Sequence, residues 1–347
     1  MAGSGFAKGS GMKPSLQPPW VRWALGRKLC LPIASFPGGQ ITGANVRQMV
    51  TEAGAQTEAV LALQARFGTR FLLTCMDLSV EAEAFRAEVV FSDDEVPTVV
   101  GRRLGGGCEV AQLELPEVGA ARTSVALEVV GRLVHHAPKC LVLAGITGPF
   151  SMAARLLGVS EALMLTVEDP ESLLALVKKC ARFLTHYVDA LYQAGAAGVL
   201  MADPTAGLMS PASLATFSAP AVKMVAAAVP DPGFAVILHH CAARAAHLPA
   251  LFCAGVSAFH FGAPMDLVVA LAAAGNETLI LGNLDPASLF VSGSPQSMHA
   301  AVADRIHRFG SDGRFVLSSG CDLPRETPLE NLDAFFEAAS AGGFVRF

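Results

Sequence analysis

The sequence predicts an α/β protein with a (β/α)8 barrel (TIM barrel) fold. Short apolar runs rich in Val, Ile and Leu alternate along the chain with segments of helical periodicity. Several of these runs stop abruptly at Gly or polar residues, which is typical of strands buried on both faces that end at a functional rim. The 347 residues are 52% hydrophobic and 16% charged, which suits one well-filled core. We expect residues 1–16 to be a flexible tail or an expression remnant, and residues 17–347 to form a single barrel domain.

Eight strands are expected, and each is followed by helix. In chain order the strands cover residues 29–36, 70–76, 140–146, 198–202, 234–240, 258–261, 278–281 and 314–318. The expected helices cover 45–67, a short segment after 79, then 123–136, 150–157, 170–194, 211–229, 248–254, 265–274, 295–309 and 329–341. Asn45 and Ser79 are the expected caps of the first two helices. Residues 88–103 are expected to be strand and loop, and the Gly105–Gly107 run lacks the strand-turn-helix frame of a dinucleotide site.

Polar and thiol side chains gather at the predicted strand ends. Chemistry in (β/α)8 barrels sits at the carboxyl ends of the strands. Those positions are occupied by Gly38, Asp77, Gly148, Asp203, His239 with Cys241, His260, Asn283 and Cys321. We therefore expect one rim of the barrel to carry the functional site.

Three of these residues form a candidate metal site. His239 and Cys241 are two residues apart, so their side chains point to the same side of an extended chain. With Cys321 after the eighth strand they offer one nitrogen and two sulfur ligands, a set typical of zinc with an open fourth position. The alternative is that these thiols pack as small hydrophobic groups, as we expect of Cys30, Cys75, Cys140, Cys180 and Cys253. Cys108, in a Gly-rich loop, fits either role.

Composition argues against two classes of partner and indicates a compartment. The net charge is −5 and no basic block is present, so no nucleic acid is expected. No apolar run approaches the roughly 18 residues of a membrane span, so no membrane is expected. No signal peptide is visible, and we expect a cytoplasmic protein whose thiols are reduced.

Four stretches resemble the uroporphyrinogen decarboxylase family, over about residues 32–341. They are Met76–Phe85, Ile146–Phe150, His239-x-Cys241 and Gly320–Pro324. The sequences of these stretches are most similar to the zinc-dependent methylcobamide:thiol methyltransferase branch, whose zinc motif is His-x-Cys with a distant Cys. The resemblance implies zinc on His239, Cys241 and Cys321, methylcobalamin as a bound substrate, and a small thiol such as coenzyme M or another methyl acceptor. The chain has no Asp-x-His-x-x-Gly corrinoid motif, so the corrinoid is expected on a separate carrier protein.

The remaining candidates have open roles. Asp77 and Asp203 are catalytic candidates that could orient a ligand, accept the thiol proton or complete the zinc shell, or could simply cap a helix; Glu81 competes with them. Gly148 and Asn283 are candidates for contact with the cofactor. His260 is expected behind the metal or in core packing, and His240 is expected to face the other side of its strand.

Sequence differences from true decarboxylases favour the methyltransferase interpretation. Those enzymes carry an Arg-Gln-Ala-Gly-Arg run near the N-terminus, where this chain has Phe36–Gln40, and their tyrosine after the Gly-x-Pro turn is replaced near Arg155. Three alternatives stay open: an unusual porphyrinogen decarboxylase, a zinc-bearing binding subunit without activity, and transfer from a methylated donor to cob(I)alamin or from methylcobalamin to tetrahydrofolate. The sequence allows a homo-oligomer and does not specify one.

Overall fold

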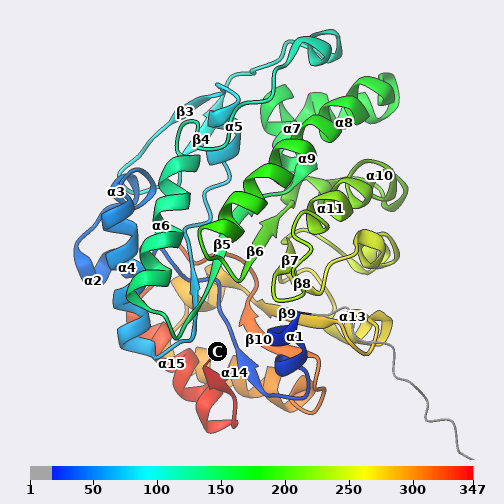
Figure 1. The fold of residues 1–347 in the computed structure, drawn as a ribbon. Coiled ribbons are helices and arrows are strands. Elements are labelled where there is room, and N and C mark those ends of the chain that lie inside the picture. Colours follow the sequence, from blue (N-terminus) through cyan, green and yellow to red (C-terminus); the bar gives the residue numbers. More distant parts are fainter. Residues whose placement is uncertain (1–17, 347) are drawn as a thin grey trace, which may run out of the picture.

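A computed structural model describes residues 18–346 and shows parallel strands surrounded by helices (Figure 1). Nine parallel strands form one curved sheet in the order β11-β1-β10-β9-β8-β7-β6-β5-β2. Their bounds are β1 (Leu29–Cys30), β2 (Phe71–Leu73), β5 (Leu141–Thr147), β6 (Gly198–Ala202), β7 (Ala235–His240), β8 (Ala258–Phe261), β9 (Leu279–Leu284), β10 (Phe315–Ser319) and β11 (Val345–Arg346). All eight expected barrel strands are present, so the predicted TIM-barrel class is confirmed.

The first strand is shorter than predicted, and a ninth strand was not predicted. β1 stops at Cys30 because Pro32 has no N–H to continue the ladder, although Leu31 N still donates to Leu317 O at 2.9 Å. On its other edge β1 pairs with β11 near the C-terminus. The described sheet therefore ends at β11 and β2. Arg346 of β11 bridges toward the β2 side by donating from Nη1 to the Phe67 carbonyl at 2.8 Å.

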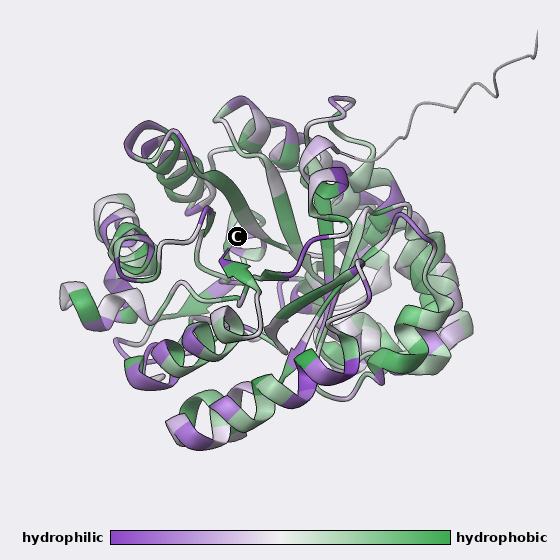
Figure 2. Cartoon of the chain, turned by 90° about the horizontal axis from the view of Figure 1, so that it is seen from below, coloured by the Kyte–Doolittle hydropathy of each residue, from purple (hydrophilic) through white to green (hydrophobic). Residues whose placement is uncertain are grey.

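The barrel has an apolar interior, and its outward side chains form a second apolar layer under the helices. Interior residues include Leu73, Leu143, Leu200, Ile237, Leu281 and Val316. Outward residues of the same strands, such as Val142, Val199 and Val236, join the helix-facing core. Figure 2, from below, shows hydrophobic strands at the centre and hydrophilic stretches along the surrounding helices. The polar strand-end residues, such as Asp77, Asp203, His239 and Asn283, lie at the carboxyl ends of these apolar strands. We call this end of the barrel the polar edge.

A short helix closes the bottom of the barrel and was not predicted. In α1 (Pro19–Ala24), the buried residues Trp20, Val21 and Ala24 belong to the interior apolar cluster. Trp20 meets Phe71, at the start of β2, edge to face with ring centroids 5.1 Å apart. In Figure 1 the helix lies in the lower part of the molecule, near β9 and β10. Its contact with Phe71, the first residue of β2, places it at the amino-terminal end of the strands. It is too short for its apolar face to be recognised from periodicity.

Two predicted long helices are each broken in two. Asn45 caps α3 (Val46–Thr51) with a capping box to Gln48, as expected, but Glu52 is extended and α4 (Ala53–Phe67) starts afresh. The expected helix 211–229 is α10 (Pro211–Phe217) and α11 (Ala219–Ala226), broken at Ser218 just before Pro220, whose ring cannot continue a helix. The breaks re-aim side chains, and Ser218 uses its hydroxyl for the site described below.

Most of the other helices agree more closely with the predicted ranges. They are α5 (Val80–Ala84), α6 (Thr123–His136), α7 (Pro149–Leu157), α9 (Pro170–Gln193), α12 (Leu248–Leu251), α13 (Leu267–Ala273), α14 (Pro295–Phe309) and α15 (Leu329–Ala341). The expected Ser79 cap of α5 is wrong, because that side chain bonds to other partners. α2 (Gly38–Thr42) and α8 (Val159–Glu168) were not predicted. β3 (Glu88–Val90) and β4 (Thr98–Val100) form an antiparallel hairpin in the segment expected to be strand and loop.

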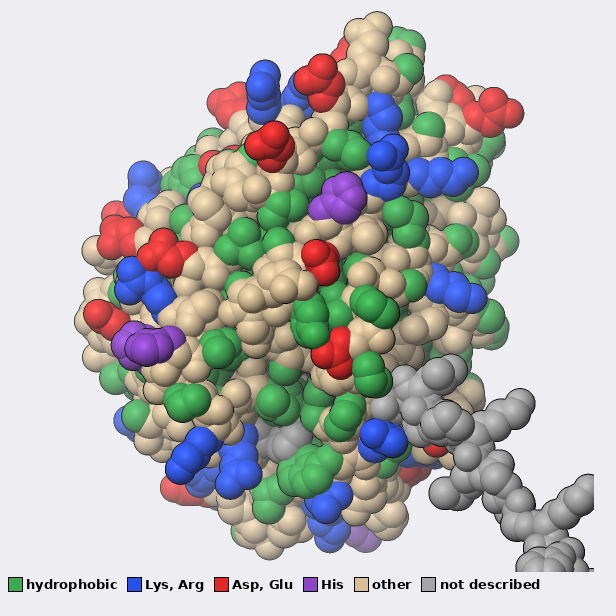
Figure 3. Space-filling model, viewed as in Figure 1, with side chains coloured by type: hydrophobic (Ala, Val, Ile, Leu, Met, Phe, Trp, Pro, Cys, Tyr) green, Lys and Arg blue, Asp and Glu red, His purple; other side chains and the backbone are tan. Residues whose placement is uncertain are grey.

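The outer surface carries charges of both signs. Figure 3 shows Lys and Arg interspersed with Asp and Glu over the face seen in Figure 1. Within residues 18–346, no single helix has both the length and the apolar composition of a membrane span; α7 and α8 reach that composition only jointly, across a 104° bend.

Candidate metal centre

His239, Cys241 and Cys321 converge at the carboxyl ends of β7 and β10. Their candidate ligand atoms all lie within 4.8 Å of one another, and Cys321 Sγ is 3.4 Å from His239 Nε2. His239 is buried, whereas both cysteines are partly exposed. The group therefore has a closed side toward the barrel and an open side toward solvent. Within residues 18–346 this is the one group of His, Cys or acidic residues with that mutual geometry.

Two glycines let the cysteine-bearing turns approach the neighbouring strands. A Cβ added at Gly262 would lie 2.1 Å from the Cys241 carbonyl oxygen, so that position admits no side chain. At Gly320, just before Cys321, a Cβ would lie 3.0 Å from Ala263 N. Backbone of this kind, tightly packed behind both thiols, holds them rigidly in place.

The two thiols share their protons unequally. The pKa of Cys241 is lowered to about 4, first by the hydrogen bond from Cys321 and then, against the opposing effect of burial, by His239. The same hydrogen bond, with burial, raises the pKa of Cys321 above its ordinary value. The pair therefore holds a thiolate beside a thiol. A thiolate is the metal-binding form of cysteine, and a metal replaces the remaining proton.

His260 lies directly behind His239, where the sequence placed it either behind the metal or in the core. Its Nδ1 is 2.8 Å from His239 Nδ1, and its Nε2 is 2.9 Å from Ser318 Oγ. Burial lowers the pKa of His260 well below the ordinary value, so the ring is neutral. His239 is thus held on its Nδ1 side and presents Nε2 to the cysteines.

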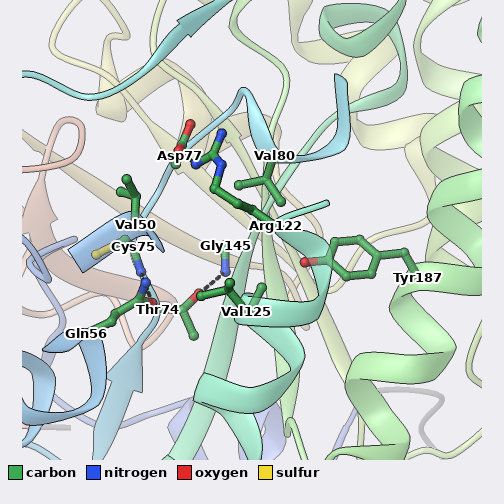
Figure 4. Close-up of a pocket in the computed structure, with 11 residues that line it drawn as sticks. Val50, Gln56, Thr74, Cys75, Asp77, Val80, Arg122, Val125, Gly145 and Tyr187 are labelled. Atoms are coloured by element: carbon green, nitrogen blue, oxygen red, sulfur yellow. Dashed lines mark hydrogen bonds and ion pairs between the residues drawn. The ribbon is translucent and has the colours of Figure 1, made fainter. Parts of the chain in front are cut away.

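Asp77 is neutralised by a buried arginine rather than aimed at the metal group. Arg122 pairs with Asp77 through Nη1 and with Glu83 through Nε, the latter at 2.6 Å. Ser79 donates from its backbone N–H and its hydroxyl to Asp77 Oδ1 at 2.9 and 2.6 Å. Figure 4 shows the Arg122 side chain beside Asp77, above a cavity of about 20 Å³ toward which Tyr187 also reaches. No local sequence pattern indicates Arg122 as the partner of Asp77.

Asp203 caps α7 and accepts a hydrogen bond from the serine between α10 and α11. Its Oδ1 accepts from Ser151 N in the first turn of α7 at 2.7 Å, and its Oδ2 accepts from Ser218 Oγ at the start of α11 at 2.7 Å. Gly148 makes room for this cap, since an added Cβ would lie 2.4 Å from the Cβ of Asp203. Asp203 and Gly148 are both buried. The Asp203 carboxylate serves as a helix cap, one of the roles considered for it.

Asn283 and Glu81 also have their hydrogen bonds inside the protein. Asn283 Nδ2 donates to the carbonyls of Gly262 and Met265 at 3.1 and 2.8 Å, which braces the turn packed against Cys241. Glu81 accepts from the Thr147 backbone at 2.9 Å and contacts its hydroxyl at 2.8 Å. Burial raises the pKa of Glu81. His240 is fully buried, and neither of its ring nitrogens has a partner; burial lowers its pKa to about 3.

An arginine that sequence reasoning missed lies against the first rim turn. Arg325, four residues after Cys321, donates from Nε to the Ala44 carbonyl at 2.8 Å. Gln40 Nε2 donates back to the Thr327 carbonyl at 2.7 Å. The Phe36–Gln40 turn, which has no arginine of its own, thus has Arg325 from a distant segment beside it. The guanidinium of Arg325 is bound to backbone carbonyl groups. No local pattern indicates such a contact across the chain.

Comparison with known proteins identifies relatives along nearly the whole chain. The sequence model of the family described as uroporphyrinogen decarboxylase (URO-D) matches residues 20–341. A methylcobamide:CoM methyltransferase MtbA from Methanosarcina mazei is 27% identical over 268 residues, which are 76% of this chain and 77% of that protein. A uroporphyrinogen decarboxylase from Trichodesmium erythraeum is 29% identical over 175 residues, 49% of this chain and 48% of that one. The solved structure of a methyltransferase from Methanosarcina mazei has the same fold, with a TM-score of 0.80 at 20% identity over 91% of this chain and 94% of that one.

Proposed function

The chain belongs to the uroporphyrinogen decarboxylase family, and from that premise we propose that it is a zinc-dependent corrinoid methyltransferase. It moves a methyl group from a methylcobamide to the sulfur of a small thiol. The observation that carries the proposal is the convergence of His239, Cys241 and Cys321 at the open end of the barrel. The methylcobamide named by a relative of similar length supports the choice of methyl donor.

The three side chains fit a zinc ion because of the ligand atoms that they offer and because one thiol is already ionised. One imidazole nitrogen and two sulfurs are the donor set that zinc prefers, and three protein ligands leave a fourth tetrahedral position free. The lowered pKa of Cys241 supplies one thiolate before any metal arrives. The partly exposed cysteines place the free position toward solvent, where a substrate thiol can reach it.

Bound zinc would hold the substrate sulfur as a thiolate at neutral pH, far below the ordinary thiol pKa of about 8.5. In the reaction a carbon–sulfur bond forms, the cobalt–carbon bond breaks with its electron pair left on cobalt, and the thiol proton goes to solvent. The protein's own residues orient the acceptor: His239 and the cysteines fix its position, and the apolar barrel below keeps water from the closed side.

The carboxylates take supporting roles in this proposal. Asp203 holds the start of α7 at the rim, and Asp77 with Arg122 joins β2 to α6. Gly148 and Asn283 act on the site through packing, since Asn283 braces the turn beside Cys241. The corrinoid arrives on a separate carrier protein in the cytoplasm, and that carrier docks at the polar edge.

The second candidate is decarboxylation of a porphyrinogen, the reaction for which the family is named. It requires cationic groups facing the substrate's carboxylates. At the first rim turn the nearby cation is Arg325, and its guanidinium already bonds the Ala44 carbonyl. We therefore place this candidate second.

One experiment separates the candidates. Purified, zinc-loaded protein is mixed with methylcobalamin and, in turn, coenzyme M, other small thiols and tetrahydrofolate, and the cobalamin absorbance is followed. A parallel reaction contains uroporphyrinogen. We expect demethylation of cobalamin with at least one thiol, and none with Cys321→Ala. Coproporphyrinogen formation without methyl transfer would establish the decarboxylase instead, and zinc binding without either reaction would indicate a binding subunit.

A further inference from the structure

We propose that His260 and Ser318 are positioning residues that fix the proton of His239 on Nδ1 and so prepare its Nε2 for the metal. They form a hydrogen-bond relay, defined here as His239, His260, Ser318 and the carbonyl of Leu31. The inference rests on the proposed zinc site and adds two residues that touch neither the metal ligand atoms nor the open rim.

The direction of every hydrogen bond in the relay follows from its far end. The Leu31 carbonyl can only accept, and Ser318 Oγ lies 2.6 Å from it, so the single hydroxyl proton of Ser318 points there. Ser318 Oγ must then accept from its other neighbour, His260 Nε2, at 2.9 Å. Two oxygens at 2.6 Å without a proton between them would repel each other.

The same logic passes through the ring of His260 to His239. A neutral imidazole has one N–H and one lone pair, and the N–H of His260 is used on Ser318. Its Nδ1 therefore accepts, and the partner at 2.8 Å, His239 Nδ1, must donate. The proton that His239 donates is thus on Nδ1. In a neutral ring Nε2 then carries the lone pair, and this is the nitrogen that faces Cys321 at 3.4 Å.

The surroundings keep the relay neutral and free of water. His260 is 1% exposed, and on its barrel side it lines a cavity of about 10 Å³ whose other walls are aliphatic side chains such as Leu143, Leu200 and Leu281. A cavity of that size with one polar neighbour does not hold a water molecule. No carboxylate in residues 18–346 is bonded to His260 in place of Ser318. A second proton on the ring would be an uncompensated buried charge.

The consequence concerns metal affinity. A histidine whose lone pair already points at the site loses no free energy to a tautomer change on binding, and partners behind metal-bound histidines contribute about 10–100-fold in affinity. The relay crosses from β7 through β8 and β10 to the segment after β1. It therefore links β7, which carries His239, to β10, the strand that leads to Cys321.

The neighbouring serine supplies a matched control. Ser319 is as buried as Ser318, lies on the same strand, and also bonds the segment after β1, by accepting from Ile33 N at 3.0 Å. It is outside the relay. The test measures zinc affinity by chelator competition for Ser318→Ala, Ser319→Ala and wild type. We expect roughly 10–100-fold weaker zinc binding in Ser318→Ala and less than about threefold in Ser319→Ala. Equal losses in the two variants would overturn the proposal.

A spectroscopic readout separates the relay from general destabilisation. Nitrogen NMR of labelled, zinc-free protein distinguishes a protonated ring nitrogen from a lone-pair nitrogen. We expect His239 with its proton on Nδ1 in wild type and in His260→Gln, whose amide can accept and donate in the same directions, and a mixture of tautomers in His260→Leu and Ser318→Ala. A wild-type His239 with its lone pair on Nδ1 and its proton on Nε2 would refute the relay. If wild type binds zinc but Ser318→Ala binds equally well, the relay fails alone; if wild type binds no zinc, the proposed function fails with it.

Discussion

The two sides of the polar edge use strand-end side chains in opposite ways. On the carboxylate side, defined by Asp77, Glu81 and Asp203, each acid spends its hydrogen-bonding capacity on the protein. On the metal side, defined by His239, Cys241 and Cys321, the ligand atoms face one another and leave capacity for a guest. Position at a strand end therefore does not make a residue functional. What separates the sides is whether neighbours have already satisfied the group.

The largest expected effect follows from removing a metal ligand. Cys241→Ala and Cys321→Ala each leave two of three ligands, so we expect zinc affinity to fall by more than the roughly 100-fold upper value for outer partners, and methyl transfer to stop. The measurement is zinc per chain after dialysis against a weak chelator. Cys253→Ala, an exposed cysteine outside the group, is the control and should keep its zinc. Full zinc retention in both variants would show that Cys241 and Cys321 do not bind zinc, and the proposed difference between the two sides would be wrong.

The next effect is on stability and belongs to the carboxylate side. Asp77→Asn leaves the buried Arg122 with Glu83 as its one carboxylate partner, so we expect a loss of about 3 kcal/mol in the free energy of unfolding and unchanged zinc content. Urea denaturation measures it. Asp93→Asn breaks the exposed pair with Arg47 and should cost less than about 1 kcal/mol. Zinc loss in Asp77→Asn at unchanged stability would make Asp77 a metal ligand and erase the distinction between the sides.

A smaller effect is expected from the helix cap. Asp203→Ala removes the acceptor of Ser151 N and Ser218 Oγ, and caps contribute about 0.5–2 kcal/mol, so the buried cap should cost near 2 kcal/mol. Asp285→Ala removes a comparable but exposed cap, from Ser288 N at 2.8 Å, and should cost less. Zinc-loaded Asp203→Ala should still demethylate methylcobalamin within a few-fold of wild type. A complete loss of turnover with stability intact would restore Asp203 as a catalytic residue.

The smallest effect sharpens the comparison through pH. Burial raises the pKa of Glu81 above its ordinary value of 4.5, so the folded protein binds this proton more tightly than the unfolded chain. The resulting stability is fully present below the unfolded pKa and is lost as pH rises through the folded pKa. Glu81→Gln keeps an acceptor for Thr147 and removes the titration. We expect the free energy of unfolding of Glu81→Gln to rise relative to that of wild type as pH increases.

Urea titrations at several pH values test this last expectation. The exposed Glu168→Gln should run parallel to wild type across the same range. A stability difference between Glu81→Gln and wild type that stays constant with pH would show that Glu81 titrates as an ordinary carboxyl.

Sequence patterns predicted the scaffold and the residues of the metal side because each strand, and each candidate ligand at a strand end, leaves a local signal. Buried strands are continuous apolar runs, and His239-x-Cys241 is a period-two pattern at the end of one. The missing parts depend on long-range contacts. Arg122 meets Asp77 across 45 residues, and Ser318 meets the Leu31 carbonyl across 287. Neither pairing leaves a trace in local spacing, and the same holds for α1, whose six residues gain their structure from the barrel floor.

The pairing of β1 with β10 and β11 has a consequence for how the chain is made. Leu29 pairs with Val316 on one edge and with Val345 on the other, so the strand that is synthesised first must wait for the segments that are synthesised last. At usual rates of translation that interval is roughly 15–60 s. During it β1 has two unpaired edges, and the interior side chain Leu29 lacks its neighbour Val316. We infer that the nascent chain needs protection over this interval, and that its slowest folding step is the joining of the two ends of the sheet.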